Sequence, residues 1–166
     1  MESPADALVH ALKYGGWRDL GEMMGARMAA VPVPVGGDPV IVPVPTTEQR
    51  RRERGYNQAE VLARVVARLR GIPLVDGLER PGGRSQVRLN PQERLSNVMG
   101  SFVLRSGLGS CIRERDVILL DDVLTTGATA LSATVALSGG GARSVHLLTF
   151  ARAIPFQAEG RRHSPN

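Results

Sequence analysis

The chain has 166 residues, of which 42% are hydrophobic, and this size and composition fit a single globular domain of residues 1–166. Its formal charge of +5 favours anionic partners, either a phosphorylated small molecule or a nucleic acid, without choosing between them. No apolar run reaches the ~20 residues that cross a bilayer, and residues 1–11 carry no secretion-signal pattern, so we expect a cytoplasmic location without membrane insertion.

Two helices are predicted at the start of the chain, over residues 5–14 and 17–30, because their apolar residues recur at helical spacing. A pair of glycines separates the two helices, and a run of prolines ends the helical pattern before residue 39. Residues 1–38 are therefore expected to form a helical segment that covers part of the domain.

A short buried strand is predicted over residues 40–45, and the polar sequence of residues 46–49 follows at its carboxyl end. Four arginines come next, in a segment expected to be a loop: Arg50, Arg51, Arg52 and Arg54. This run could be merely solvated or could bind an anion, and the sequence leaves both interpretations open. A helix is predicted to begin after Asn57, which is expected to act as its N-cap with Glu60 in the capping-box position.

Two more short strands are predicted over residues 71–75 and 101–104. The segment of residues 80–104 is polar and rich in arginine, and a segment of this length inside a compact domain is usually a lid or disordered. Its arginines Arg84, Arg88 and Arg94 are candidates for binding an anion. A solvated hairpin explains each of them, taken alone, almost as well.

The most informative stretch is DVILLDDVLTTGAT, residues 116–129. The four apolar residues 117–120 predict a strand that is buried on both faces. Asp121 and Asp122 follow at its carboxyl end, which is the edge where open α/β sheets bind their ligands.

A small, hydroxyl-rich loop follows the acid pair, and the helix predicted over residues 130–137 follows the loop. Free amides of the loop and of the first helical turn, together with threonine hydroxyls, suit a phosphate group. Carboxylates repel a phosphate unless hydroxyls or a divalent cation lie between them, so a sugar phosphate suits both halves. The alternative is a structural turn in which Asp121 and Asp122 merely cap a helix.

The last strand is predicted over residues 145–150, and residues 155–166 are expected to form a frayed tail. Strands alternate with helices along the chain, which predicts an α/β fold with a parallel sheet and right-handed crossovers. The ligand is then expected at the carboxyl edge of that sheet.

The stretch of residues 116–129 resembles the phosphoribosyl diphosphate (PRPP) signature of type I phosphoribosyltransferases: four hydrophobic residues, two acids, two further residues and then T-T-G-small-T. The resemblance implies a Rossmann-like parallel sheet flanked by helices. It also implies that residues 1–38 form a small N-terminal hood and that residues 80–104 form a flexible lid loop. The implied reaction displaces diphosphate from C1 of PRPP, with Mg²⁺ as cofactor.

Two further segments resemble the ComF family, whose members have the phosphoribosyltransferase fold and are associated with DNA uptake. The first segment is VPVPTTEQRRRERGYNQAEVLAR, residues 42–64. The second is the pattern Q-x-x-L-x-x-x-x-R-x-x-N-x-x-G-x-F, which matches Gln86, Leu89, Arg94, Asn97, Gly100 and Phe102.

On this resemblance, Asp121 and Asp122 bind the ribose hydroxyls and the associated Mg²⁺, directly or through substrate or water. The loop that binds the substrate and its 5′-phosphate comprises Val123, Leu124, Thr125, Thr126, Gly127, Ala128 and Thr129. The diphosphate is assigned to Thr46, Thr47 and the lid arginines Arg84, Arg88 and Arg94, and Arg50 is a further substrate-binding candidate. Of these, Arg84 and Arg88 are expected to act with the acid pair in catalysis.

The resemblance implies a PRPP-binding phosphoribosyltransferase with an unidentified acceptor, linked to DNA uptake. The competing hypothesis is a non-catalytic protein that binds PRPP or a nucleotide, or an accessory protein that engages single-stranded DNA. Expected partners are PRPP or a related ribose phosphate and, under the competing hypothesis, single-stranded DNA or DNA-uptake proteins. A homodimer is compatible with either hypothesis.

Overall fold

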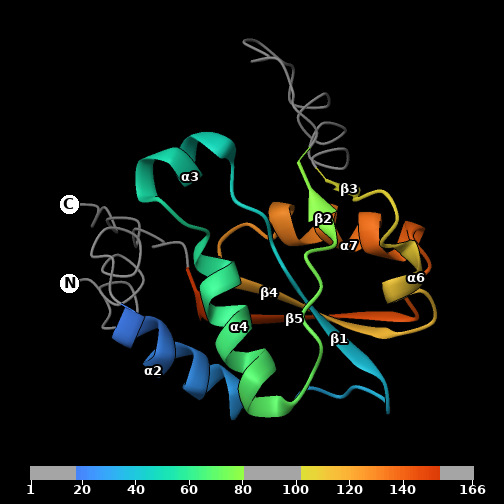
Figure 1. Cartoon of the computed structure of the whole chain (residues 1–166), viewed down its shortest axis with the longest axis horizontal. Coiled ribbons are helices and arrows are strands. Elements are labelled where there is room, and N and C mark those ends of the chain that lie inside the picture. Colours follow the sequence, from blue (N-terminus) through green and yellow to red (C-terminus); the bar gives the residue numbers. More distant parts are fainter. Residues whose placement is uncertain (1–17, 81–101, 154–166) are drawn as a thin grey trace, which may run out of the picture.

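A computed structural model describes residues 18–80 and 102–153 of the chain (Figure 1). The elements, in chain order, are α2 (Arg18–Ala29), β1 (Pro39–Pro43), α3 (Glu48–Arg54), α4 (Gln58–Arg70), β2 (Leu78–Glu79), β3 (Val103–Leu104), α6 (Gly109–Ile112), β4 (Asp116–Leu124), α7 (Ala128–Gly139) and β5 (Ser144–Arg152). No helix in these described ranges is long and apolar enough to span a bilayer.

The central sheet is parallel, as predicted, with the strand order β1-β4-β5. Its register aligns Ile41 with Ile118 and Ile118 with His146. The strand predicted over residues 71–75 is reduced to a single parallel bridge between Leu74 and Ile41. Pro73 precedes that bridge and has no amide to donate, which limits further pairing. Strands β2 and β3 form a separate antiparallel pair.

The core is built around β4. All four apolar residues of its first half, Val117 to Leu120, are fully buried, so both faces of the sheet are covered. Helix α4 packs against β1 and β4, and α2 packs against α4 and β5. Helix α7 contacts β4 and β5 and lies on the side of the sheet away from α2 (Figure 1). Close packing of α2 on α4 needs Gly25, because a Cβ atom there would lie 2.6 Å from the Val65 Cβ.

Several boundaries differ from the sequence prediction. Strand β4 continues through the acid pair to Leu124, and α7 begins two residues earlier than predicted, at Ala128. The arginine run, expected to be a loop, forms helix α3. This helix was missed because it buries no residue and so has no apolar period to detect. Its stabilising contacts are polar: Thr47 Oγ1 accepts from the Arg50 amide at 3.3 Å.

Some predictions lie outside the described residues: the helix over residues 5–14, residues 1–17 of the hood segment, residues 81–101 of the lid segment, and the tail. The lid arginines Arg84, Arg88 and Arg94 are among them. The assignment of residues 1–38 as a hood and of residues 80–104 as a lid therefore stays a prediction.

A buried carboxylate, Asp116, joins three segments at the amino end of β4. It is 6% exposed, and it accepts hydrogen bonds from Arg143 Nε (2.8 Å), from the Gly36 amide and from Ser144 Oγ (2.8 Å). These donors, Arg143 above all, hold the pKa of the Asp116 carboxyl well below its usual range. The carboxylate therefore links the loop before β1 to the start of β5.

Replacing this carboxylate is expected to change how stability depends on pH. Because the folded protein lowers the pKa of Asp116, the unfolded chain binds more protons than the folded chain below about pH 4. The stabilisation by Asp116 is thus fully present above about pH 5 and is lost as the pH falls below about 4. Asp116→Asn should lower the free energy of unfolding at neutral pH and flatten its decline in acid, as measured by urea denaturation.

The matched control is Asp76→Asn, which removes an exposed carboxylate that pairs with Arg105 at 3.1 Å. It should leave the free energy of unfolding nearly unchanged at neutral pH, because exposed ion pairs stabilise little. A decline in acid as steep for Asp116→Asn as for the unmodified chain would contradict the role given to Asp116.

Candidate functional site

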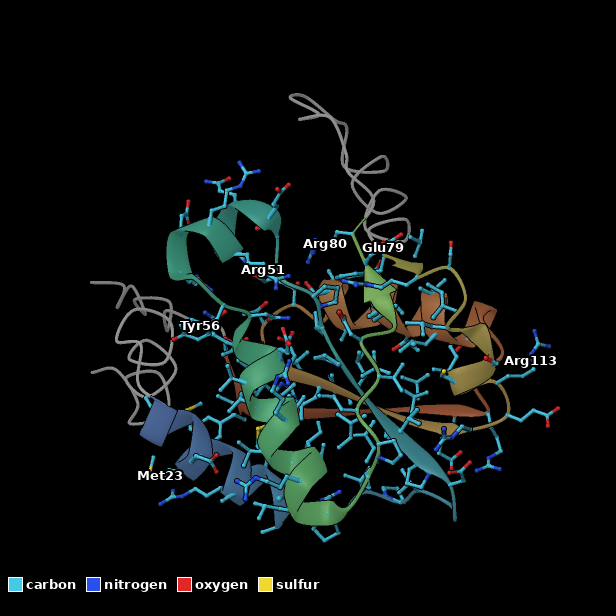
Figure 2. The ribbon with its side chains drawn as sticks, viewed as in Figure 1. Met23, Arg51, Tyr56, Glu79, Arg80 and Arg113 are labelled. Atoms are coloured by element: carbon cyan, nitrogen blue, oxygen red, sulfur yellow. The ribbon has the colours of Figure 1, made fainter. Side chains whose placement is uncertain are left out.

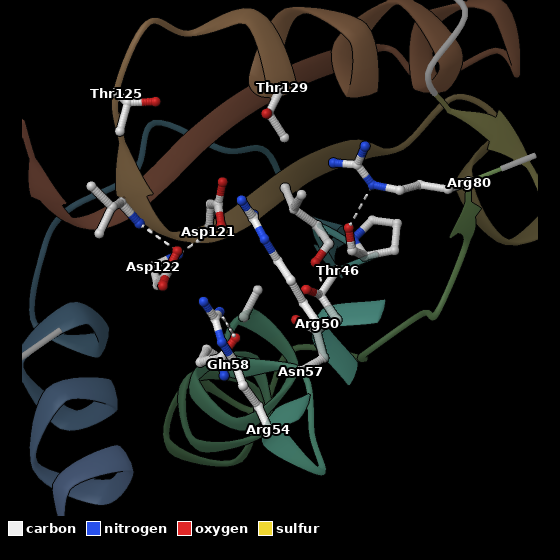
Figure 3. Close-up of a pocket in the computed structure, with 14 residues that line it drawn as sticks. Thr46, Arg50, Arg54, Asn57, Gln58, Arg80, Asp121, Asp122, Thr125 and Thr129 are labelled. Atoms are coloured by element: carbon white, nitrogen blue, oxygen red, sulfur yellow. Dashed lines mark hydrogen bonds between the residues drawn. The ribbon is translucent and has the colours of Figure 1, made fainter. Parts of the chain in front are cut away.

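A cavity of about 300 Å³ lies at the carboxyl ends of β1 and β4 (Figure 3). It is walled by the end of β1 and the following loop, by α3 and the start of α4, by Arg80 after β2, and by the end of β4 with the start of α7. Its lining residues are Val44, Pro45, Thr46, Arg50, Arg54, Asn57, Gln58, Ala59, Arg80, Asp121, Asp122, Val123, Thr125 and Thr129. Segments far apart in the sequence thus meet at the predicted edge.

The acid pair occupies one wall of the cavity. Asp121 and Asp122 are half-buried residues of β4, each of which accepts a hydrogen bond from the next amide in the chain. The distances are 2.9 Å from the Asp122 amide to Asp121 Oδ1 and 2.8 Å from the Val123 amide to Asp122 Oδ1. These local bonds fix both carboxyl groups at the strand end.

The loop after β4 provides hydroxyls and a helix start. Gly127 has a φ of +80° and precedes the first residue of α7, and Thr125 and Thr129 line the cavity on either side of it. The Thr126 hydroxyl accepts from the Ala128 amide at 3.4 Å. The amino end of α7 therefore lies beside the two cavity-lining threonines.

The remaining predicted residues of this loop lie apart from the main cavity. Leu124 and Gly127 line a small adjoining hollow that they share with Thr125 and Thr129. Thr126 and Ala128 line neither space and instead contact one another.

The two threonines after β1 have different positions. Thr46 lines the cavity, as the prediction required, whereas Thr47 does not. The Thr47 hydroxyl instead caps α3. The structure therefore brings only one of these two threonines to the site.

Three arginines line the same cavity: Arg50 and Arg54 from α3, and Arg80 from the end of β2. Arg80 Nε donates to the Pro45 carbonyl at 3.2 Å, and its guanidinium lies 4.4 Å from the centre of the Phe102 ring. Burial and the charge of Arg50 lower the pKa of Arg80, while Asp121 opposes that shift. The cavity therefore holds basic side chains together with the acid pair.

Sequence reasoning left Arg54 open, as part of the arginine run, and did not identify Asn57, Gln58 or Arg80 as site residues. The first three lie within the ComF-like segment of residues 42–64, so that segment carried the available signal. No sequence signal identified Arg80, because its contacts with Pro45 and Phe102 depend on the path of the chain around the β2–β3 pair.

The capping box predicted for α4 is wrong. Asn57 makes no side-chain cap; its Nδ2 donates to the Val44 carbonyl at 3.0 Å. Glu60 pairs with Arg64 at 2.6 Å instead of returning to the helix start. A contact across the fold therefore replaces the local one, and it ties the start of α4 to the end of β1.

A second hollow, of about 190 Å³, adjoins the cavity and shares Thr46, Asn57 and Arg80 with it. Figure 2 shows Arg51 and Arg80, which both line this hollow, at the edge where α3 and β2 lie. No group of three or more His, Cys, Asp or Glu side chains suited to a metal occurs within the described ranges 18–80 and 102–153.

Comparison with curated proteins finds relatives among competence proteins. The chain is 34% identical over 118 residues to competence protein ComFC of Bacillus subtilis, covering 68% of this chain and 44% of the relative. It is 30% identical over 115 residues to competence protein F of Haemophilus influenzae, covering 68% and 50%. The chain thus spans about half the length of the curated relatives it matches. No protein-family model matches the chain.

Comparison with solved structures identifies similar folds. Glutamine PRPP amidotransferase from B. subtilis, in complex with ADP and GMP, gives a TM-score of 0.58 at 18% identity, covering 86% of this chain and 30% of that one. An allosteric regulatory enzyme of purine biosynthesis gives a TM-score of 0.56 at 19% identity with the same coverage. At these identities the similarity concerns the fold alone.

The backbone at Gly127 can be tested by substitution. Gly127→Ala is expected to lower the free energy of unfolding by about 1–2 kcal/mol, because an L-residue is strained at a φ of +80°. A new Cβ would come no closer than 3.9 Å to Leu124, so the cost is conformational and not a clash. Urea denaturation measures the change.

Gly139→Ala serves as the control because Gly139 is the last residue of α7 and has open space around it. That substitution is expected to be neutral or stabilising by up to about 1 kcal/mol. Equal effects at the two glycines would contradict a special backbone requirement at Gly127.

Proposed function

Because this chain belongs to the ComF family and has the type I phosphoribosyltransferase fold, we propose that it binds PRPP and transfers the phosphoribosyl group to an acceptor, releasing diphosphate. A role in DNA uptake is part of the proposal, in view of the competence proteins to which the chain is similar.

The observation that carries this proposal is the combination of three chemistries in one cavity. The hydroxyls of Thr125 and Thr129, beside the amino end of α7, suit the 5′-phosphate as hydrogen-bond donors. The acid pair suits the ribose hydroxyls, as acceptors of hydrogen bonds. Arg50 is one of the arginines that line the cavity, and guanidinium groups suit the diphosphate.

A magnesium ion fits this donor set as an ion carried by the ligand. Asp121 and Asp122 offer hard carboxylate oxygens at the cavity wall, but the described residues hold no third carboxylate beside them. Mg²⁺ commonly binds through one or two carboxylates, waters and the phosphates of a substrate. When bound, it would offset the charge of the departing diphosphate.

In the proposed reaction, a nucleophile forms a bond to C1 of the ribose while the bond from C1 to the diphosphate oxygen breaks. The diphosphate leaves with the bonding electron pair, and the proton of the nucleophile passes to solvent or to the departing diphosphate. Positive charge gathers on the sugar beside Asp121 and Asp122. Negative charge gathers on the leaving group near the arginines, so fixed charges favour the transition state on both sides.

The second candidate is a non-catalytic binding protein, and helix α3 favours it. This helix buries no residue and carries four arginines, two of which, Arg51 and Arg52, lie outside the main cavity. Such a surface could engage the phosphates of single-stranded DNA, with binding that weakens as salt rises.

Calorimetric titration with PRPP and Mg²⁺ tests the proposal. The unmodified chain should bind PRPP, and Asp121→Asn and Asp122→Asn should each weaken binding by about tenfold or more, because each removes a charge-assisted acceptor. Diphosphate release, assayed with purine and pyrimidine bases, ammonia and glutamine, then identifies the acceptor class.

Glu22→Gln provides the control, since it removes one carboxylate from the exposed surface of α2, where Glu22 pairs with Arg68. It should leave PRPP affinity unchanged. PRPP binding without turnover on any acceptor would favour the non-catalytic candidate, and the absence of PRPP binding would overturn the proposed function.

A further inference from the structure

A buried amide in the cavity wall has no explanation in the fold itself. Gln58, the first residue of α4, is 3% exposed and lines the cavity, yet its buried Nε2 has no hydrogen-bond partner within residues 18–80 and 102–153. An unsatisfied buried donor lowers stability because its desolvation is not offset. A hydrophobic side chain of similar size would avoid that loss, so the amide requires another reason.

The oxygen of the same amide orients an arginine. Arg54 Nη1 donates to Gln58 Oε1 at 3.1 Å, and both residues line the cavity (Figure 3). A guanidinium can only donate hydrogen bonds, so Arg54 bonds to the oxygen of the Gln58 amide. The NH₂ group of that amide is then the end without a partner among the described residues.

In this bond the acceptor for Arg54 is a neutral side chain. Arg52 and Arg64 are each held by a glutamate four residues earlier, Glu48 and Glu60. A glutamate at position 58 would also suit the first turn of a helix and would bond a guanidinium more strongly. It would, however, add a negative charge to the cavity wall, whereas glutamine positions Arg54 without doing so.

The backbone at the same place is uncapped. Val61 donates the first backbone bond of α4, to the Asn57 carbonyl, so the amides of residues 58–60 have no acceptor within the helix. The Asn57 side chain does not cap them, because it contacts Val44 instead. Asn57, Gln58 and Ala59 all line the cavity, so the positive end of the α4 dipole adjoins it.

We infer that the start of α4 forms an anion subsite with Arg54, in which Gln58 is the positioning residue, and that this subsite takes the diphosphate end of the ligand. The inference rests on the proposed function and specifies it. It assigns the diphosphate to α4 and Arg54 in place of Thr47, whose hydroxyl is occupied by the cap of α3. The 5′-phosphate then lies at the other helix start, at α7.

The test compares three ligands with Mg²⁺ by calorimetry: PRPP, inorganic pyrophosphate and ribose 5-phosphate. In Gln58→Glu the new carboxylate neutralises Arg54, so affinity for PRPP and for pyrophosphate should fall by about tenfold or more. Affinity for ribose 5-phosphate should stay within about twofold, because its phosphate binds at the α7 end.

A second variant tests whether Gln58 positions Arg54 for the ligand or only stabilises the fold. Gln58→Met removes the buried unsatisfied donor and also the acceptor of Arg54 Nη1, and because these two effects on stability oppose each other, its melting temperature should stay close to that of the unmodified chain. Its affinity for pyrophosphate should nevertheless fall, because Arg54 loses its positioning partner. Gln49→Glu is the control: it adds the same charge on α3 outside the cavity, with loss of only the exposed hydrogen bond from Gln49 to Glu53, and should leave all three affinities unchanged.

The outcomes distinguish the two levels of the proposal. If the unmodified chain binds PRPP and pyrophosphate and the Gln58 variants bind them equally well, the subsite is overturned while the proposed function stands. An equal loss for all three ligands also overturns the subsite, since it shows no preference for the diphosphate end. If the unmodified chain binds none of the ligands, the proposed function and the subsite fail together.

Discussion

The parallel pairing of β1 with β4 is the constraint on which the site depends. The register ends with Pro43 opposite Leu120, and the Val44 amide continues it by donating to the Leu120 carbonyl at 2.8 Å. The loop after β1 therefore leaves the sheet directly beside the acid pair. Because parallel strands release their loops at one edge, residues some 70 positions apart form one cavity wall.

Within that cavity, neutral groups hold the charged ones in place. The Pro45 carbonyl accepts from Arg80, and the Gln58 amide accepts from Arg54. The Asn57 side chain anchors the start of α4 to the end of β1. These positioning groups are uncharged, so they add no further negative charge to that of Asp121 and Asp122 in the same cavity. This arrangement differs from the exposed faces of α3 and α4, where carboxylates pair with arginines.

The differences between prediction and structure have physical causes. Strand β4 was predicted because burial on both faces leaves a run of consecutive apolar residues, and helix α7 because a small, hydroxyl-rich loop precedes it in the chain. Helix α3 left none, since it is stabilised by polar contacts and buries no side chain. The Asn57 cap failed because a tertiary acceptor, the Val44 carbonyl, captured the side chain that a local rule assigned to the helix.

The sequence by itself determined the α/β fold, the acid pair and the threonine loop, because each depends on neighbours in the chain. Only the tertiary structure decided which arginines serve the cavity. Arg50 and Arg54 both line the cavity because residues four apart share one face of a helix. This relation depends on the helical conformation of α3, which the sequence analysis did not predict. Arg80 joins them because the path of the chain around β2 and β3 places it over Phe102, a contact that no local pattern encodes.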